Sequence, residues 1–317
     1  MVADRGPRAL SFRLDGDESW PGNGLIGATM RGPYSSSSFI VVGIDGSRSA
    51  AQAALWAIDE AVSRDVPLQL VCAIDATNEG DRDDATEVAA AEHAIKNVIT
   101  EIESTGKQVK VEADVVHSHP AAALLEASRS VAMICVGSTG VKHAMQGRIG
   151  STAAALALAA HCPVAVMPTS SVSRQDGLIL AAVDESPSCS AVLELAVQEA
   201  RLRGAPLRAI TMRRRQIGGG YATGPAADRS HRIERQIDHR LTHWRRNNPD
   251  LDIESVHDHF SLLNYLEQLQ RTATPIQLVV VDPMRPGPTD VLLRPSGRAT
   301  MDAAGCALLI CDRQWWL

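Results

Sequence analysis

The chain has 317 residues, a net charge of −6, six cysteines, 45% hydrophobic residues and 3% aromatic residues. This length exceeds the usual size of one hydrophobic core and predicts two domains of about 150 residues. The acidic charge disfavours general coating of nucleic acid. The cysteines lie apart in the sequence without a C-x-x-C pair, which is typical of reduced thiols. No apolar run reaches the roughly 18 residues that are needed to cross a membrane. We therefore expect a soluble, cytoplasmic protein without a membrane partner.

The first 37 residues mix Gly, Pro, Ser and charged residues without a sustained period. We expect residues 1–37 to form a flexible N-terminal extension, within which Met30 is an alternative start that the sequence leaves open. From residue 39, short β-branched runs alternate with helical patterns, which predicts βαβ units and a buried parallel sheet. The expected strands are 39–45, 68–75, 109–116, 132–137 and a last one after 163, and the expected helices are 49–64, 86–105, 121–130 and 151–160.

The same order of segments then repeats. I-V-V-G-I-D-G-S matches L-I-L-A-A-V-D-E-S and sets Asp45 against Asp184 at an offset of 139 residues. Three further segments follow in the same order: V-H-S-H-P with V-H-D-H-F, M-I-C-V-G with L-V-V-V-D, and H-C-P-V-A-V-M with G-C-A-L-L-I-C. The chain is therefore a tandem duplication, with a first domain at 38–170 and a second at 177–313, joined by a Ser-rich linker.

A loop of the form G-x2-G-x9-G-S, from Gly137 through Gly140 to Gly150, lies between an expected strand and an expected helix. In open α/β sheets, ligands bind beyond the carboxyl ends of the strands. Glycines let backbone N–H groups approach anionic oxygens, and a helix that begins at Ser151 offers free N–H groups to a phosphate. The basic residues of the loop, which could neutralise the outer phosphates, are Lys142, His143 and Arg148. A phosphate chain is the expected ligand; the alternative is a set of turn glycines and a helix N-cap.

Asp45 is a second marker of the same edge. It ends the first expected strand and is followed by Gly46 and Ser47. An acidic residue at this position can hydrogen-bond a base or a ribose, as in other doubly wound folds. The alternative is that Asp45 caps the following helix.

These motifs, together with the closing C-P-V-A-V-M-P, resemble the universal stress protein family, in the tandem-domain type common in actinobacteria. The resemblance is strong over residues 39–170 and weak over 178–312. It implies two tandem Rossmann-like (adenine nucleotide alpha hydrolase-like) α/β domains, each with an open five-stranded parallel sheet and helices on both faces. It also implies a dimer contact through the last strand, so that the second domain is a pseudo-dimer partner of the first and a homodimer can form on top of it.

The resemblance implies binding of ATP or another adenine nucleotide, such as cyclic AMP, with or without Mg²⁺. Function would then be stress or dormancy signalling through nucleotide-dependent binding of an unidentified protein partner, with a slow ATPase as the alternative. Asp45 would contact the adenosine, and Ala73 would border the base. Val136 and Gly137 would line the pocket, and the ribose and phosphates would be held by Gly140, Gly150, Ser151 and Thr152. The expected nucleotide-binding residues are Asp45, Ala73, Val136, Gly137, Gly140, Arg148, Gly150, Ser151 and Thr152.

The second half departs from this pattern at the loop. The aligned pairs are Asp282 with Gly137, Arg285 with Gly140, Pro295 with Gly150 and Ser296 with Ser151. An acidic side chain at the strand end and a proline without an N–H at the helix start both oppose phosphate binding. We predict that the second domain does not bind ATP in the same way, although it retains Asp184.

Other patterns carry less information. No P-loop, G-x-S-x-G or H-E-x-x-H motif is present. His239 and His243 have the spacing of a metal-binding pair, but we favour the interpretation that they lie on a solvated helix face. The pairs His117/His119 and His257/His259 favour a turn or pocket-rim role. The segment 201–246 holds twelve arginines against three acidic residues; it is either a solvated helix face, which is favoured, or a docking face for nucleic acid or an acidic protein.

Overall fold

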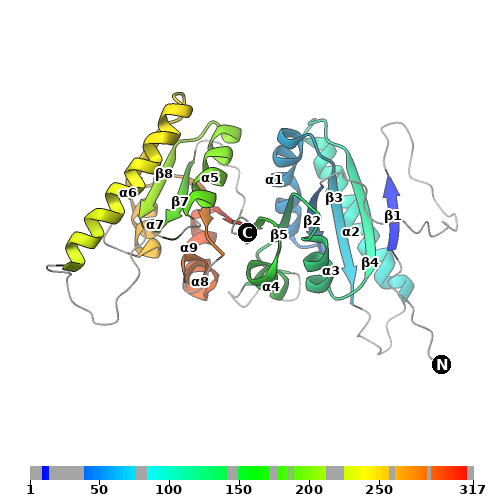
Figure 1. Ribbon diagram of the computed structural model, residues 1–317. Coiled ribbons are helices and arrows are strands. Elements are labelled where there is room, and N and C mark those ends of the chain that lie inside the picture. The colour runs from blue at the N-terminus through cyan, green and yellow to red at the C-terminus, as the bar shows by residue number, and fades with distance from the viewer. Residues whose placement is uncertain are drawn as a thin grey trace. The chain divides into compact units, whose positions relative to one another are not determined.

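The computed structural model describes residues 9–13, 39–75, 84–140, 149–170, 177–184, 186, 189–211, 225–256, 261–283 and 287–312. The chain divides into two compact units, Met1–Thr169 and Ser170–Leu317. Figure 1 shows the first unit in blue to green and the second in green to red.

The first unit is an open parallel sheet with helices on both faces. Its five parallel strands have the order β4-β3-β2-β5-β6. Helices α1 and α2 pack together on one face, and α3 and α4 pack together on the other. The elements are β2 (Ile40–Ile44), α1 (Arg48–Arg64), β3 (Leu68–Ile74), α2 (Asp84–Ser104), β4 (Val111–His117), α3 (Pro120–Ala127), β5 (Met133–Gly137), α4 (Ser151–Ala159) and β6 (Val164–Met167).

Strand β1 (Ala9–Arg13) is a finding that the sequence did not predict, because it falls within the expected extension 1–37. It pairs antiparallel with β4, with Ala9 opposite Val116 and Arg13 opposite Glu112. The outer edge of β4 offers unpaired backbone N–H and C=O groups, and an edge of this kind accepts a short strand of almost any sequence. For that reason the local sequence gave no signal of β1.

The second unit repeats the architecture. Its parallel strands have the order β9-β8-β7-β10-β11, so the predicted tandem α/β fold is confirmed. One element has no counterpart in the described part of the first unit: the short helix α8. The elements are β7 (Leu178–Val183), α5 (Cys189–Arg203), β8 (Leu207–Thr211), α6 (Pro225–Asn247), β9 (Ile253–Val256), α7 (Leu262–Arg271), β10 (Ile276–Val281), α8 (Pro288–Leu293), α9 (Pro295–Ala304) and β11 (Ala307–Ile310).

Strand register aligns the two units residue by residue. In the first, Val42 of β2 pairs with Cys135 of β5; in the second, Ala181 of β7 pairs with Val280 of β10. Two residues farther along each of these central strands stand Gly137 and Asp282. The structure therefore confirms that Asp282 occupies the position of Gly137.

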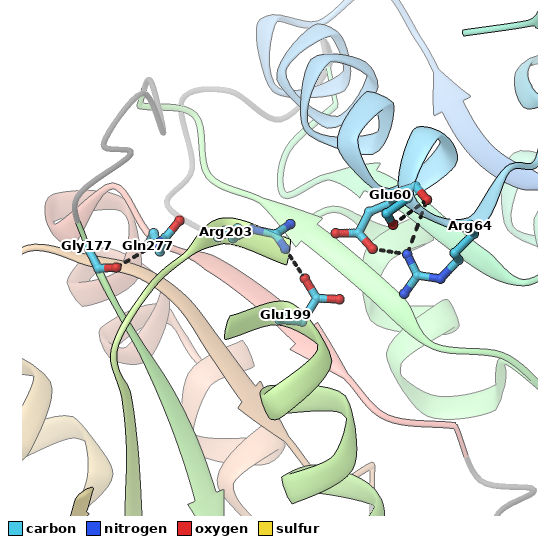
Figure 2. A network of polar contacts seen from close by, with 7 residues as sticks. Glu60, Arg64, Gly177, Glu199, Arg203 and Gln277 are labelled. Carbon is cyan, nitrogen blue, oxygen red and sulfur yellow. Dashed lines mark hydrogen bonds and ion pairs between the residues drawn. The ribbon is translucent and has the colours of Figure 1, made fainter. Parts of the chain in front are cut away.

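The repetition extends to a charged pair on the first helix of each unit (Figure 2). In α1, Glu60 is fully buried and pairs with Arg64, and in α5, Glu199 is buried and pairs with Arg203. Both pairs have i, i+4 spacing, and the offset between them is the 139 residues that separate Asp45 from Asp184. A buried carboxylate costs folding free energy unless a cation compensates it, so each copy kept carboxylate and cation together.

Candidate functional site

The centre of the first sheet is its topological switch point. Strands β2 and β5 are neighbours, and the helices that follow them, α1 and α4, lie on opposite faces. At such a switch point, ligands of doubly wound folds bind in a crevice at the carboxyl ends of the strands. Asp45 follows β2 and Gly137 ends β5, so both predicted markers stand at this edge of the sheet.

Asp45 is exposed, and its two carboxylate oxygens have different surroundings. Oδ1 accepts a hydrogen bond from the Ser47 N–H at 2.9 Å. The N-cap of α1 is Ser47, whose hydroxyl accepts from the Ala50 N–H at 3.2 Å, so the alternative that Asp45 caps the helix is wrong. Burial raises the pKa of the nearby Cys72 thiol to about 11, and the negative charge of Asp45 contributes to this.

Gly140 lies against the other oxygen of Asp45. A Cβ at Gly140 would stand 2.8 Å from Asp45 Oδ2, closer than Cβ atoms approach such oxygens. Gly140 and Asp45 are 95 residues apart in sequence, yet they meet because β2 and β5 are adjacent strands. Glycine at this position therefore avoids a clash with the carboxylate, a contact that the sequence did not predict.

Gly137 is needed for a different contact, with the first turn of α1. A Cβ at Gly137 would lie 2.3 Å from Ser49 Oγ and 2.8 Å from the Ala50 nitrogen. The glycine therefore lets α1 approach the end of β5 closely. This is helix–strand packing, a role that the sequence analysis did not assign to it.

Gly150 brings the start of α4 to the same place. It is the N-cap of α4, and its own N–H donates to the Ser138 carbonyl at 2.8 Å. A Cβ at Gly150 would stand 3.6 Å from the Gly140 nitrogen. Ser151, the first helical residue, is exposed, and Thr152 is half-buried. The first turn of α4, with its free N–H groups, thus lies next to Gly140 and Asp45.

The other predicted site residues have different surroundings. Ala73 is half-buried in β3, one residue beyond Cys72, the partner of Ile44. Val136 is buried, with Cγ1 only 3.2 Å from where a Cβ at Gly43 would stand. Lys142, His143 and Arg148 fall in 141–148, outside the described residues.

Ser49 is a residue of this edge that the sequence analysis missed. Its side chain is buried, and its hydroxyl donates to the Thr139 carbonyl at 2.7 Å across 90 residues of sequence. The hydroxyls of Thr139 and Thr169 lie 3.4 Å apart on the far side of the same segment. A serine in the first turn of a helix gives no sequence signal of a long-range contact, because serine is common there for capping.

The second unit keeps the aspartate turn but changes the facing edge. Asp184 Oδ1 accepts from the Ser186 N–H at 2.8 Å, as Asp45 does from Ser47. Asp282 is buried, and its carbonyl accepts a hydrogen bond from the Thr289 hydroxyl of α8. Helix α8 is packed on α9, since a Cβ at Gly297 would lie 2.2 Å from the Val291 carbonyl oxygen.

Pro295, the counterpart of Gly150, is the first residue of α9 and lacks an N–H. Arg285, the counterpart of Gly140, falls outside the described ranges. In the first unit the corresponding connection brings glycines to the strand ends, whereas in the second a packed helix stands there. The second edge therefore differs in its residues and in the helix α8 that precedes α9.

Several arginines of segment 201–246 are engaged within the second unit. Arg203 pairs with Glu199, Arg208 Nε lies 3.1 Å from Glu254, and Arg245 Nε donates to the Ile253 carbonyl at 2.8 Å. Arg240 lies beside Cys189, where burial raises the pKa of the thiol and the guanidinium opposes this rise. These contacts favour the interpretation of the segment as a helix face of the unit over that of a docking surface.

The histidine pairs show local roles where they are described. His119 is the N-cap of α3, and His243 Nε2 lies 3.0 Å from the Asn247 amide nitrogen; His257 and His259 fall outside the described ranges. The described residues contain no cluster of three His, Cys, Asp or Glu side chains suited to a metal ion. None of the helices in the described ranges is long and apolar enough to span a bilayer.

The fold and the switch-point edge define a tandem, doubly wound α/β protein. Residues 39–168 match the model of the universal stress protein family. Universal stress protein Rv2028c of Mycobacterium tuberculosis is 38% identical over 281 residues, covering 87% of this chain and 96% of the relative. Universal stress protein Rv3134c of the same species is 39% identical over 247 residues, covering 77% and 87%. The chain belongs to the universal stress protein family.

Solved structures agree on the fold. The crystal structure of a universal stress protein from Archaeoglobus fulgidus is 17% identical with a TM-score of 0.60, covering 88% of this chain and 97% of that one. The match extends over both units, so the tandem arrangement of two α/β repeats also occurs in that protein.

Proposed function

We propose that the first unit binds ATP or another adenine nucleotide at the crevice between β2 and β5. The observation that carries the proposal is the convergence of Asp45, Gly140 and Gly150. A carboxylate oxygen, a glycine without a Cβ and the start of a helix lie within about one ligand width of each other. The carboxylate suits a ribose or base, and the helix start suits a phosphate.

The surroundings fit a nucleotide in chemistry as well as in shape. None of the other described residues accepts a hydrogen bond from the N–H of Thr139 or of Gly140. The Gly140 N–H, together with the N–H groups at the start of α4, offers hydrogen-bond donors suited to phosphate oxygens. Arg148, in the connecting segment, would neutralise the outer phosphates, with or without Mg²⁺.

The second unit does not bind the nucleotide in this way under the proposal. Pro295 removes a donor at the helix start, Asp282 brings a carboxyl group to the strand end, and α8 lies between β10 and α9. We propose that the protein acts in the cytoplasm as a stress or dormancy signalling protein, whose occupied first unit changes its affinity for a protein partner.

The test is titration calorimetry of the full chain with ATP. We expect one site per chain, weakened about a hundredfold by Asp45→Ala because hydrogen bonds to a charged group are lost. Asp184→Ala is the matched control, since it removes the same turn carboxylate from the second unit and should leave the affinity unchanged. Two equal sites, no site, or equal effects of the two variants would contradict the proposal.

A further inference from the structure

Within the proposed nucleotide site, we infer that Ser49 is a positioning residue: its hydroxyl fixes the peptide group between Thr139 and Gly140 and so directs the Gly140 N–H at a phosphate of the nucleotide. The inference rests on the proposed function and adds to it a residue from α1 that touches no ligand. It begins from a buried hydrogen bond, from Ser49 Oγ to the Thr139 carbonyl oxygen at 2.7 Å.

The direction of the Gly140 N–H follows from peptide geometry. The Thr139 carbonyl and the Gly140 N–H belong to one planar group, and in a trans peptide the two bonds point in opposite directions. Because Ser49 holds the carbonyl oxygen toward α1, the Gly140 N–H points away from α1. Rotation of this peptide would break a buried hydrogen bond and leave the Thr139 carbonyl without its partner.

The two peptide groups that precede it are fixed as well. The Ser138 N–H donates to the Met167 carbonyl at 2.8 Å, and the Ser138 carbonyl accepts from the Gly150 N–H at 2.8 Å. The segment from Ser138 to Gly140 is therefore attached to β6, to the start of α4 and, through Ser49, to α1. Of the attachments made by described residues, the last determines the Thr139–Gly140 peptide.

The Gly140 nitrogen is also well placed for an anion. It lies 3.6 Å from the position of a Cβ at Gly150, which begins α4, so its donor adds to the donors of the helix start. The approach of Ser49 depends on Gly137, because a Cβ there would come within 2.3 Å of the hydroxyl. Asp282 replaces this glycine in the second unit, which therefore lacks the space for the same contact.

The experiment compares ATP with adenosine, which lacks phosphates, on the full-length chain and its Ser49→Ala variant. We expect Ser49→Ala to weaken ATP binding about tenfold, the effect of one misdirected charge-assisted donor, and to leave adenosine binding within about twofold. The matched control is Ser188→Ala, which changes the same repeat position in the second half and should alter neither affinity.

The outcomes separate this inference from the proposed function. If the unmodified chain binds no ATP, the proposed function is wrong. If it binds ATP and Ser49→Ala binds it equally well, or loses ATP and adenosine affinity by the same factor, the positioning role is wrong. Thermal unfolding of Ser49→Ala at saturating adenosine checks that the variant is folded. Rescue of ATP binding by Ser49→Thr, which restores a hydroxyl, would further support the role.

Discussion

The carboxyl edges of the two units began as copies and now differ in one connection. Both keep an aspartate after the first central strand, with the same hydrogen bond to the N–H two residues on. In the first unit, glycines after the facing strand bring that aspartate close to the start of α4. In the second, Asp282 follows the strand and α8 packs on α9. The aspartate therefore has the same local structural role in both units, and the units differ in the connection that faces it.

The comparison also separates what folding requires from what binding requires. Strand order, register and the buried Glu–Arg pair on the first helix are the same in both units. These features determine the core, where a loss would cost stability in either copy. The connection at the carboxyl edge differs, because the second copy keeps this core although Asp282 and Pro295 replace two of the glycines.

The largest effect is expected from adding a methyl group at two glycines. Gly137→Ala brings a Cβ within 2.3 Å of Ser49 Oγ, and Gly297→Ala brings one within 2.2 Å of the Val291 carbonyl. We expect each to destabilise its own unit by about 2–4 kcal/mol, since overpacked backbone must shift. Scanning calorimetry measures the stability of both variants and titration with ATP their affinity.

Only Gly137→Ala should also abolish ATP binding, because only it displaces the nucleotide site. If Gly297→Ala lost ATP binding to the same extent, the second unit would contribute to the site. The predicted difference between the two units in ATP binding would then be wrong.

A smaller effect concerns one buried thiol in each unit. Burial raises the pKa of Cys72 to about 11 and that of Cys306 to about 12, from an ordinary value of 9.0. The folded state binds these protons more tightly than the unfolded state. The resulting contribution to the free energy of unfolding is fully present below pH 9, and it is lost as the pH rises through about 11 for Cys72 and about 12 for Cys306. At pH 10 each thiol should cost about 1 kcal/mol of stability relative to pH 8.

Denaturant titrations between pH 8 and 10.5 test this with Cys72→Ala and Cys306→Ala. Each variant should show a shallower fall of stability with pH than the unmodified chain. Parallel curves for variant and unmodified chain would mean that the thiols have the same pKa in the folded and unfolded states, which would contradict the prediction.

The last prediction is that a double substitution in the second unit leaves the number of ATP sites unchanged. Asp282→Gly combined with Pro295→Gly restores the glycines of the first unit at two aligned positions of the second. We expect calorimetry still to count one ATP site per chain, because α8 and its contact with Gly297 remain. A second site of similar affinity would show that these residue types, and not the packed helix, separate the two units.

Much of the fold was open to prediction from the sequence. The alternation of β-branched runs with helical patterns, and its repetition at a fixed offset, gave the strands, the helices and the duplication, because buried parallel strands and amphipathic helices have distinct periods. Strand β1 was missed since an added edge strand needs only free backbone groups beside it. Asp45 was found as a residue of the edge, but its exclusion as the helix cap in favour of Ser47 required the structure.

The sequence by itself determined the repeat, the position of Asp45 and the glycines between strand and helix, and the loss of those glycines in the second copy. These are properties of residue type and order along the chain. Only the tertiary structure decided that Gly140 faces Asp45, that Gly137 serves the approach of α1, and that Ser49 holds the Thr139 carbonyl. These contacts join residues about 90 apart, and their geometry depends on which strands are neighbours and how closely helix and strand pack, which no local pattern records.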